Sequence, residues 1–212
     1  MNHFHTREDV HIDLSHRCPL KCSRCQRQMW YSGKFYDKVI GSDLPMRTIQ
    51  MLVNKFKFIS FSGQLPDPIH YPKFIEVLKL CNNKKKRVLV QTASSFKPIS
   101  WFKKAFEAYP QAIWRFGLDG LPEESHKYRV NQDGKKIFQV MLEAKNILTK
   151  APIWQYIVFK YNENHQLQAK RMARENGLRF VIMKSSRWLN PDNDPLLPSK
   201  KNRLGSTFEK SV

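Results

Sequence analysis

The chain has 212 residues and a formal net charge of +19, from 37 Lys and Arg against 18 Asp and Glu. No apolar run approaches the roughly 20 residues that span a bilayer, and the N-terminal MNHFHTREDV carries charge where a signal peptide needs an apolar segment. These features argue against membrane and secreted classes, so we expect a cytoplasmic protein with one domain and a large core.

Apolar, β-branched segments alternate along the chain with segments whose apolar residues recur every three or four positions. This is the pattern of a parallel sheet covered by helices. In chain order, strands are predicted at 10–15, 56–63, 87–93, 112–120, 153–162 and 178–185. Helices are predicted between them at 46–55, 71–82, 100–109, 137–150 and 165–177. Six β/α units fall short of a closed eight-stranded barrel, so the expected fold class is α/β, a partial (β/α)6 TIM-like barrel.

The character of the sequence changes after about residue 187. The stretch LNPDNDPLLPSKKNRLGSTFEKSV contains three prolines and shows little periodicity. We therefore expect a core domain over residues 1–188, followed by an extended or disordered basic tail over residues 189–212.

The most unusual sequences follow the predicted strands, where catalytic loops lie in folds of this kind. In strand order they are CPLKCSRC, SGQLPDP, TASS, LDG and KYN. The high positive charge favours association with polyanions. However, the densest basic run, 84–87, precedes the third strand and so lies at the opposite edge of the sheet, where a solvated loop explains it as well.

Three cysteines, Cys18, Cys22 and Cys25, lie within eight residues, with Cys81 far away. They make a poor disulfide framework and suggest metal or redox chemistry. A structural zinc site needs a fourth ligand, for which His11, His16 or Cys81 is available. Cys81 lies in an amphipathic helix, where a small buried thiol is the usual role. A cubane iron-sulfur cluster held by three thiolates would leave one iron open to another ligand.

The spacing Cys18-x-x-x-Cys22-x-x-Cys25 after a first strand resembles that of the radical S-adenosylmethionine (radical SAM) enzymes. The resemblance implies a [4Fe-4S] cluster whose open iron is chelated by S-adenosylmethionine (SAM). It also implies reductive cleavage of SAM to a 5′-deoxyadenosyl radical, which abstracts hydrogen from a substrate. The cofactors supply that chemistry, and the protein supplies binding and aim.

The resemblance continues through about residue 188. In FSGQLPDP, Gly63 and Asp67 are similar to the Gly-rich turn and acidic residue that bind the SAM amino group. The alternative for Asp67 is a turn aspartate that caps the next helix. In FGLDGLPEESHKYRV, the resemblance places Asp119 near the cofactor ribose and Arg129 on its carboxylate. Thr92 occupies the strand-three turn.

Strand alternation adds two further groups. Tyr156, Val158, Lys160 and Asn162 share one face of the fifth strand, so Lys160 and Asn162 are predicted to project into a polar site; the alternative for Lys160 is an exposed strand end. On the fourth strand, Arg115, Gly117 and Asp119 share a face. Arg115 there would bind substrate or pair with a carboxylate in the core.

Three departures from the family pattern stand out. Arg24 occupies a position that is usually aromatic, TAS replaces the common Thr-Asn-Gly, and no cysteine follows Cys81. The chain therefore resembles a minimal core related to peptide-modifying and molybdenum-cofactor-synthesis members, without an auxiliary cluster domain. The aromatic segment 26–45 either covers the cluster as a lid or packs across the first strand.

The leading hypothesis is a radical SAM enzyme that takes electrons from a one-electron donor such as flavodoxin or ferredoxin. Its substrate is unknown: a peptide, a small molecule or RNA. The alternative is a basic iron-sulfur or zinc protein that binds nucleic acid without catalysis. A third hypothesis is an inactive remnant of the enzyme fold.

Overall fold

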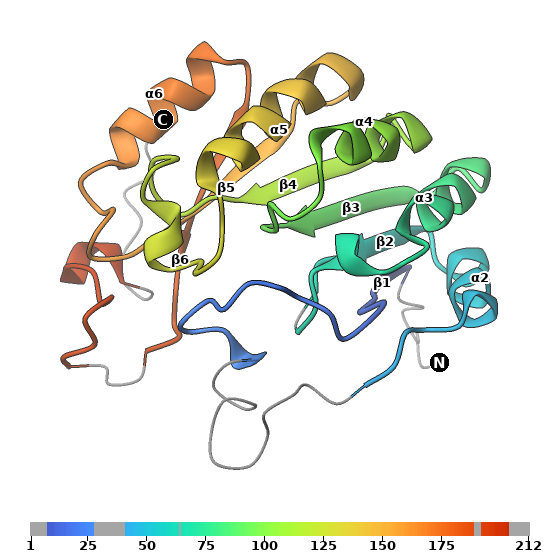
Figure 1. Cartoon of the computed structure of the whole chain (residues 1–212), viewed down its shortest axis with the longest axis horizontal. Coiled ribbons are helices and arrows are strands. Elements are labelled where there is room, and N and C mark those ends of the chain that lie inside the picture. Colours follow the sequence, from blue (N-terminus) through green and yellow to red (C-terminus); the bar gives the residue numbers. More distant parts are fainter. Residues whose placement is uncertain (1–7, 28–40, 64, 189–191, 204–212) are drawn as a thin grey trace, which may run out of the picture.

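A computed structural model describes residues 8–27, 41–63, 65–188 and 192–203. Its centre is one parallel sheet of six strands in the order β1-β2-β3-β4-β5-β6, so every strand pairs with its neighbour in sequence (Figure 1). The strands are β1 (Asp9–His11), β2 (Phe58–Phe61), β3 (Arg87–Thr92), β4 (Ile113–Gly117), β5 (Ile153–Val158) and β6 (Arg179–Lys184).

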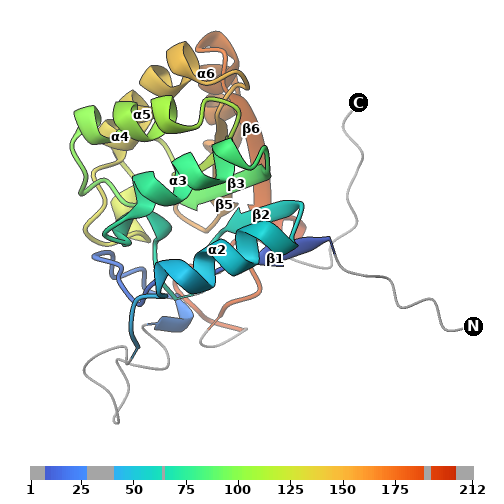
Figure 2. The ribbon, with the colours of Figure 1, turned by 90° about the vertical axis from the view of Figure 1, so that its right-hand side faces the viewer.

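Helices connect the strands and form a layer on one face of the curved sheet (Figure 2). The α-helices are α2 (Met46–Lys55), α3 (Phe74–Asn83), α4 (Ile99–Ala108), α5 (Gly134–Ile147) and α6 (Gln166–Glu175). Short 3-10 turns are η1 (Pro68–His70), η2 (Ser125–Lys127) and η3 (Lys200–Asn202). The predicted α/β partial barrel is confirmed, because parallel strands alternate with helices throughout the sheet.

The first strand is shorter than predicted. Ladder pairing with β2 ends at His11, although the Ile12 N–H still donates to the Ser60 carbonyl. Beyond it the backbone leaves the sheet while Ile12 and Leu14 remain buried, and the Leu14 carbonyl accepts from Leu44 N–H just before α2. The apolar pattern over 10–15 therefore reports burial correctly but not strand pairing.

The main core lies between the sheet and the helix layer. Alternate strand residues with large apolar side chains, such as Trp114, Phe116 and Trp154, are fully buried there. Trp114 meets Phe106 of α4 edge to face, with ring centroids 4.9 Å apart, a geometry that adds to the stabilisation from area burial. The intervening strand residues face the other side of the sheet, where the cavity described below lies. No helix in the described part of the chain is long and apolar enough to cross a membrane.

Part of the predicted tail packs against the body of the protein. Asp194 and Leu197 are buried, and Lys160 N–H donates to the Leu196 carbonyl. Glu163, after β5, accepts hydrogen bonds from Ser199 and Asn202. Residues 192–203 thus belong structurally with the sheet, whereas 189–191 and 204–212 lie outside the described residues. The domain boundary at residue 188 stays a prediction.

Candidate active site

A cavity of about 490 Å³ opens beside the C-terminal ends of the strands. This size falls within the roughly 300–1,000 Å³ of typical ligand pockets. Its lining joins the sequences expected there: the three clustered cysteines, Gly63, Asp67, Thr92 and Arg129. The same lining includes Arg115 and Gly117 from β4. In folds of this kind the catalytic loops follow the strands, and most of the predicted site residues do lie together at the strand ends.

The cysteine loop forms one wall of the cavity. Cys22 is buried and Cys18 and Cys25 are partly exposed, all as free thiols. Cys25 N–H donates to the Cys22 carbonyl over 3.0 Å, which closes a turn. The N–H groups of Lys21 and Ser23 donate to carbonyls of the segment after η2, at Val130 and Tyr128. The connection between β4 and α5 thus fixes the path of the loop.

The surroundings of these thiols disfavour the thiolate form when no positive charge is beside it. Burial, with Asp67 nearby, raises the pKa of Cys18 to about 12. Burial raises the pKa of Cys22 to about 11, although the Arg129 guanidinium opposes the shift. Thiolates at these positions would need strong positive charge beside them, which coordinated iron provides.

A single metal ion is one alternative for the three thiols. No three His, Cys, Asp or Glu side chains in the described residues gather closely enough to hold one metal ion. A single zinc ion would require all its thiolates about 2.3 Å from one point. In a cubane each thiolate binds a different iron, so the donors stand farther apart. Cys81 takes no part, because it lies fully buried in α3 within the main core.

Asp67 is buried and surrounded by donors from the turn after β3. Thr92 Oγ1 donates to its carboxylate over 2.8 Å, and the N–H groups of Ala93 and Ser94 donate to Oδ2 over 2.9 and 3.0 Å. Its Oδ1 also accepts a longer bond from Ile69 N–H at the start of η1. Asp67 is therefore both a turn cap, as the alternative interpretation holds, and a link between the ends of β2 and β3. These bonds occupy most of its acceptor sites.

Gly63 is required for the turn that precedes Asp67. Its φ of +57° lies in the left-handed region, and a Cβ at this position would come within 2.1 Å of the Pro66 carbonyl oxygen. Only glycine fits such a place without strain. Gly63 therefore allows the backbone to make the tight turn beside the cavity.

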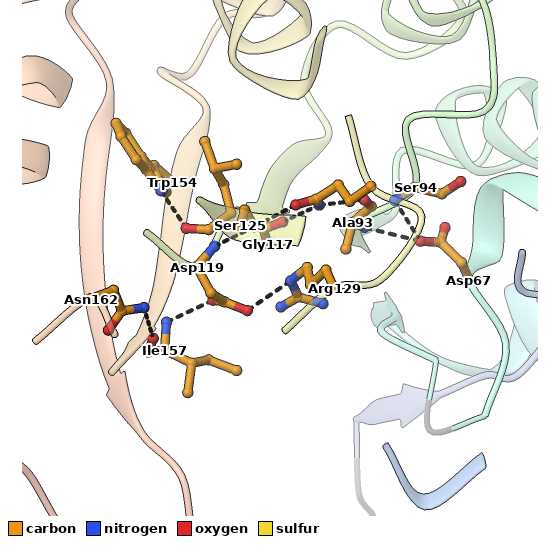
Figure 3. A network of polar contacts seen from close by, with 12 residues as sticks. Asp67, Ala93, Ser94, Gly117, Asp119, Ser125, Arg129, Trp154, Ile157 and Asn162 are labelled. Atoms are coloured by element: carbon orange, nitrogen blue, oxygen red, sulfur yellow. Dashed lines mark hydrogen bonds and ion pairs between the residues drawn. The ribbon is translucent and has the colours of Figure 1, made fainter. Parts of the chain in front are cut away.

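Asp119 and Arg129 form a buried ion pair at the end of β4 (Figure 3). Arg129 Nε lies 2.8 Å from Asp119 Oδ2, and Ile157 N–H of β5 donates to Asp119 Oδ1 over 2.7 Å. Burial raises the pKa of Asp119, while Arg129 and the Ile157 N–H act in the opposite direction. The Arg129 guanidinium lies against Gly117, where an added Cβ would approach Nη2 to 2.5 Å. Glycine in β4 therefore makes room for the arginine at the cavity wall.

Two residues that sequence reasoning missed extend this network. Asp119 N–H donates to Ser125 Oγ, which in turn donates to Gln132 Oε1. The Gln132 amide then donates to the carbonyls of Ala93 and Gly117, which joins the ends of β3 and β4. Figure 3 shows these contacts running across the strand ends. Nothing in the spacing of Ser125 or Gln132 distinguishes them from ordinary loop residues.

The structure does not bring Lys160 or Asn162 to the cavity. Lys160 is exposed, as its alternative interpretation holds. The Asn162 side chain is used locally: Oδ1 accepts from Phe159 N–H, and Nδ2 donates to the Ile157 carbonyl. The predicted face of β5 is wrong, because Tyr156 and Val158 lie in the main core.

Gln155 and Ile157 line the cavity instead. Alternation defines two faces of a strand but does not say which one faces the helices. The large apolar residues Trp154 and Tyr156 were the available signal, since a helix-covered face collects such side chains.

Arg24, which departs from the family pattern, makes a second buried ion pair. Its Nε and Nη2 donate to the two carboxylate oxygens of Asp194 over 2.8 and 3.0 Å. The side chains are 9% and 0% exposed. Arg24 lies between Cys22 and Cys25, so this bidentate pair ties the cysteine loop to the segment after β6.

Comparisons with known proteins agree with this architecture. No family model matches the sequence, and no curated protein matches it. SuiB of Streptococcus suis bound to its precursor peptide SuiA matches with a TM-score of 0.67 and 14% identity, over 82% of this chain and 38% of that one. SuiB bound to S-adenosylmethionine matches with a TM-score of 0.65 and 15% identity, over 84% and 41%. Methylornithine synthase (PylB) matches with a TM-score of 0.62 and 14% identity, over 96% and 57%.

This chain thus spans between about two fifths and three fifths of the length of these proteins. Both SuiB and PylB are radical SAM proteins. At such low identity the likeness concerns the path of the chain. The protein therefore has the fold of the radical SAM enzymes.

Proposed function

We propose that this protein is a radical SAM enzyme. The observation that carries the proposal is the three-cysteine loop on the wall of a strand-end cavity, in a fold shared with SuiB and PylB. Cys18, Cys22 and Cys25 would hold a [4Fe-4S] cluster. A cluster with SAM on its open iron would supply one-electron cleavage to a 5′-deoxyadenosyl radical, which abstracts hydrogen from a substrate.

The chain's own residues would prepare and enclose that site. Asp67 holds the turn after β3 against η1, so the backbone of Thr92 and Ala93 is in place before a ligand arrives. Arg129 is fixed by Asp119 through Nε, and its guanidinium also lines the cavity. Its other N–H groups would donate hydrogen bonds to the carboxylate of SAM, a contact that suits a planar guanidinium. Such pre-arranged donors lower the ordering cost of binding.

The finer assignments are part of the proposal. A one-electron donor such as flavodoxin or ferredoxin would reduce the cluster. SuiB is described with a precursor peptide and PylB as a synthase of methylornithine, so peptide and small-molecule substrates are both consistent with this fold.

The test is anaerobic reconstitution with iron and sulfide, followed by reduction with dithionite in the presence of SAM. We expect about four irons per chain and formation of 5′-deoxyadenosine, measured by chromatography. Cys18→Ala, Cys22→Ala and Cys25→Ala should each abolish this product, because each removes a cluster ligand.

Cys81→Ala is the matched control. This thiol lies in the main core away from the cavity, so iron content and product formation should remain at the wild-type level. An intact cluster that forms no 5′-deoxyadenosine would contradict the proposal. Salt-sensitive nucleic-acid binding with no turnover would favour the non-catalytic alternative.

A further inference from the structure

The wall of the cavity below the cysteine loop is polar and includes an unusual arginine. The inward-facing residues Gln91, Arg115 and Gln155 come from the neighbouring strands β3, β4 and β5. Gln91 and Arg115 are directly opposite each other in the strand register. Arg115 thus projects from the sheet into the same cavity that the cysteines line.

Arg115 lacks a counter-ion in the part of the chain that the structure describes. Its one hydrogen bond runs from Nη1 to Gln91 Oε1 over 2.9 Å. Nε is buried and makes no hydrogen bond, and no carboxylate in the described ranges pairs with this guanidinium. Burial lowers the pKa of Arg115, and the positive charge of Arg179 lowers it further. Arg115 is half-buried, so its guanidinium is partly removed from water, and no carboxylate in the described ranges compensates for that desolvation.

The two more deeply buried arginines of the site have the counter-ion that Arg115 lacks. Arg24 pairs with Asp194 and Arg129 pairs with Asp119. Among the cavity carboxylates, Asp67 is already engaged by the turn after β3, and Asp13 is exposed at the rim beyond β1. Nε is shielded from solvent, so the donors that Arg115 retains for a ligand are on its terminal nitrogens: Nη2 and the second hydrogen of Nη1, held in orientation by the bond to Gln91.

We propose that Arg115 binds an oxyanion of the substrate, a carboxylate or a phosphate, with Gln91 as the positioning residue. A guanidinium donates two parallel hydrogen bonds to either group. This inference rests on the proposed function for the identity of the cavity as a substrate site. The proposal assigns the substrate class. The substrate would be a molecule with an anionic group, and it would bind in the barrel with that group facing β4.

The experiment uses two probes, inorganic phosphate and acetate, titrated calorimetrically into the anaerobically reconstituted protein without SAM or reductant. Ionic strength is held constant, because the net charge of +19 attracts anions non-specifically. We expect one saturable site that Arg115→Met weakens at least about tenfold for the preferred probe. Arg115→Lys should retain part of the affinity, since a point charge remains but the fork is lost.

Matched variants separate the proposed contact from general charge and from folding. Arg47→Met removes an exposed cation on α2, outside the cavity, and should leave the affinity unchanged. Gln91→Leu keeps the arginine but frees its orientation, and should weaken binding by an intermediate amount. If Arg115→Met fails to fold by circular dichroism, Arg115→Lys and Gln91→Leu decide the question.

A tighter complex with phosphate would indicate a phosphorylated substrate, and a tighter complex with acetate a carboxylic acid; either supports the proposal. Wild-type protein that binds neither probe saturably would overturn it, as would Arg115→Met protein with wild-type affinity. Since the titration requires no cofactor cleavage, either negative result leaves the 5′-deoxyadenosine test of the proposed function unaffected.

Discussion

Two buried arginine–aspartate pairs flank the cysteine loop, and they differ in what they connect. Asp119 and Arg129 lie in one β4–α5 connection, at the centre of a network that includes Ser125 and Ile157. Arg24 and Asp194 are separated by 170 residues and join the cysteine loop to the segment after β6. The first pair is built into a single β/α unit, whereas the second exists only when two distant segments meet. We therefore expect the first to control global stability and the second to control local docking.

The largest effect is expected from Arg129→Met. It would leave the fully buried Asp119 carboxylate without its cation, a loss that costs about 3–5 kcal/mol in comparable pairs. The free energy of unfolding, measured by urea denaturation, should fall by that order. Lys127→Met in the same connection removes an exposed cation and should change stability little. If Arg129→Met lowered the free energy of unfolding by less than about 1 kcal/mol, the pair would not be a main determinant of global stability.

Arg24→Met should act more locally. Asp194 would lose its guanidinium, but the segment that carries it could expose the carboxylate by detaching from the sheet. We expect amide hydrogen exchange to speed up over residues 192–203, with a smaller change in global stability than for Arg129→Met. Asp194→Asn should have a similar effect, and the double variant should be little worse than either single variant, because the two act on one interaction. Lys21→Met, an exposed residue of the same loop, serves as the control. Unchanged exchange in that segment would contradict the assigned link.

The smallest effect concerns acidification. Partial burial alone would raise the pKa of Glu163, but hydrogen bonds from Ser199 and Asn202 lower it below its usual value of 4.5. A carboxyl whose pKa is depressed in the folded state contributes stability above its unfolded pKa and loses it as the pH falls through the folded value. Docking of η3 should therefore weaken below about pH 4.5, measured by limited proteolysis with pepsin. Glu163→Gln should remove this pH dependence, and a segment equally protected at pH 5 and pH 3.5 would argue against it.

Much of the fold and part of the site could be predicted from the sequence. Alternating β and α patterns predicted the sheet, because burial of one face imposes a period on each element. The glycine turn at Gly63 and the cluster of cysteines were likewise visible, since each reflects a local chemical requirement. The positions of Asp119 and Arg129 were predicted as cofactor contacts, and the structure shows that each is first a partner of the other. The Asp119–Arg129 contact depends on how the β4–α5 connection folds back on itself. The number of residues between the two side chains does not predict that fold.

The remaining errors have a common cause. Arg24 was recognised as unusual, but a single arginine and a single aspartate 170 residues apart leave no periodic trace in the sequence. The orientation of β5 was wrong because alternation defines two faces without naming the buried one. Gln132 bridges two strand ends through backbone carbonyls, which every residue carries. Contacts of these kinds depend on tertiary geometry rather than on residue pattern.

The Arg24–Asp194 link has a consequence for the order of events during synthesis. The consecutive strand order allows each β/α unit to pair with the preceding one as the ribosome releases it. The turn that holds Cys22 and Cys25, although translated early, cannot gain its bidentate anchor until residue 194 has emerged. Completion of the cysteine loop is thus a late event in the life of the nascent chain, and the proposed cluster would be loaded after translation of the last strand.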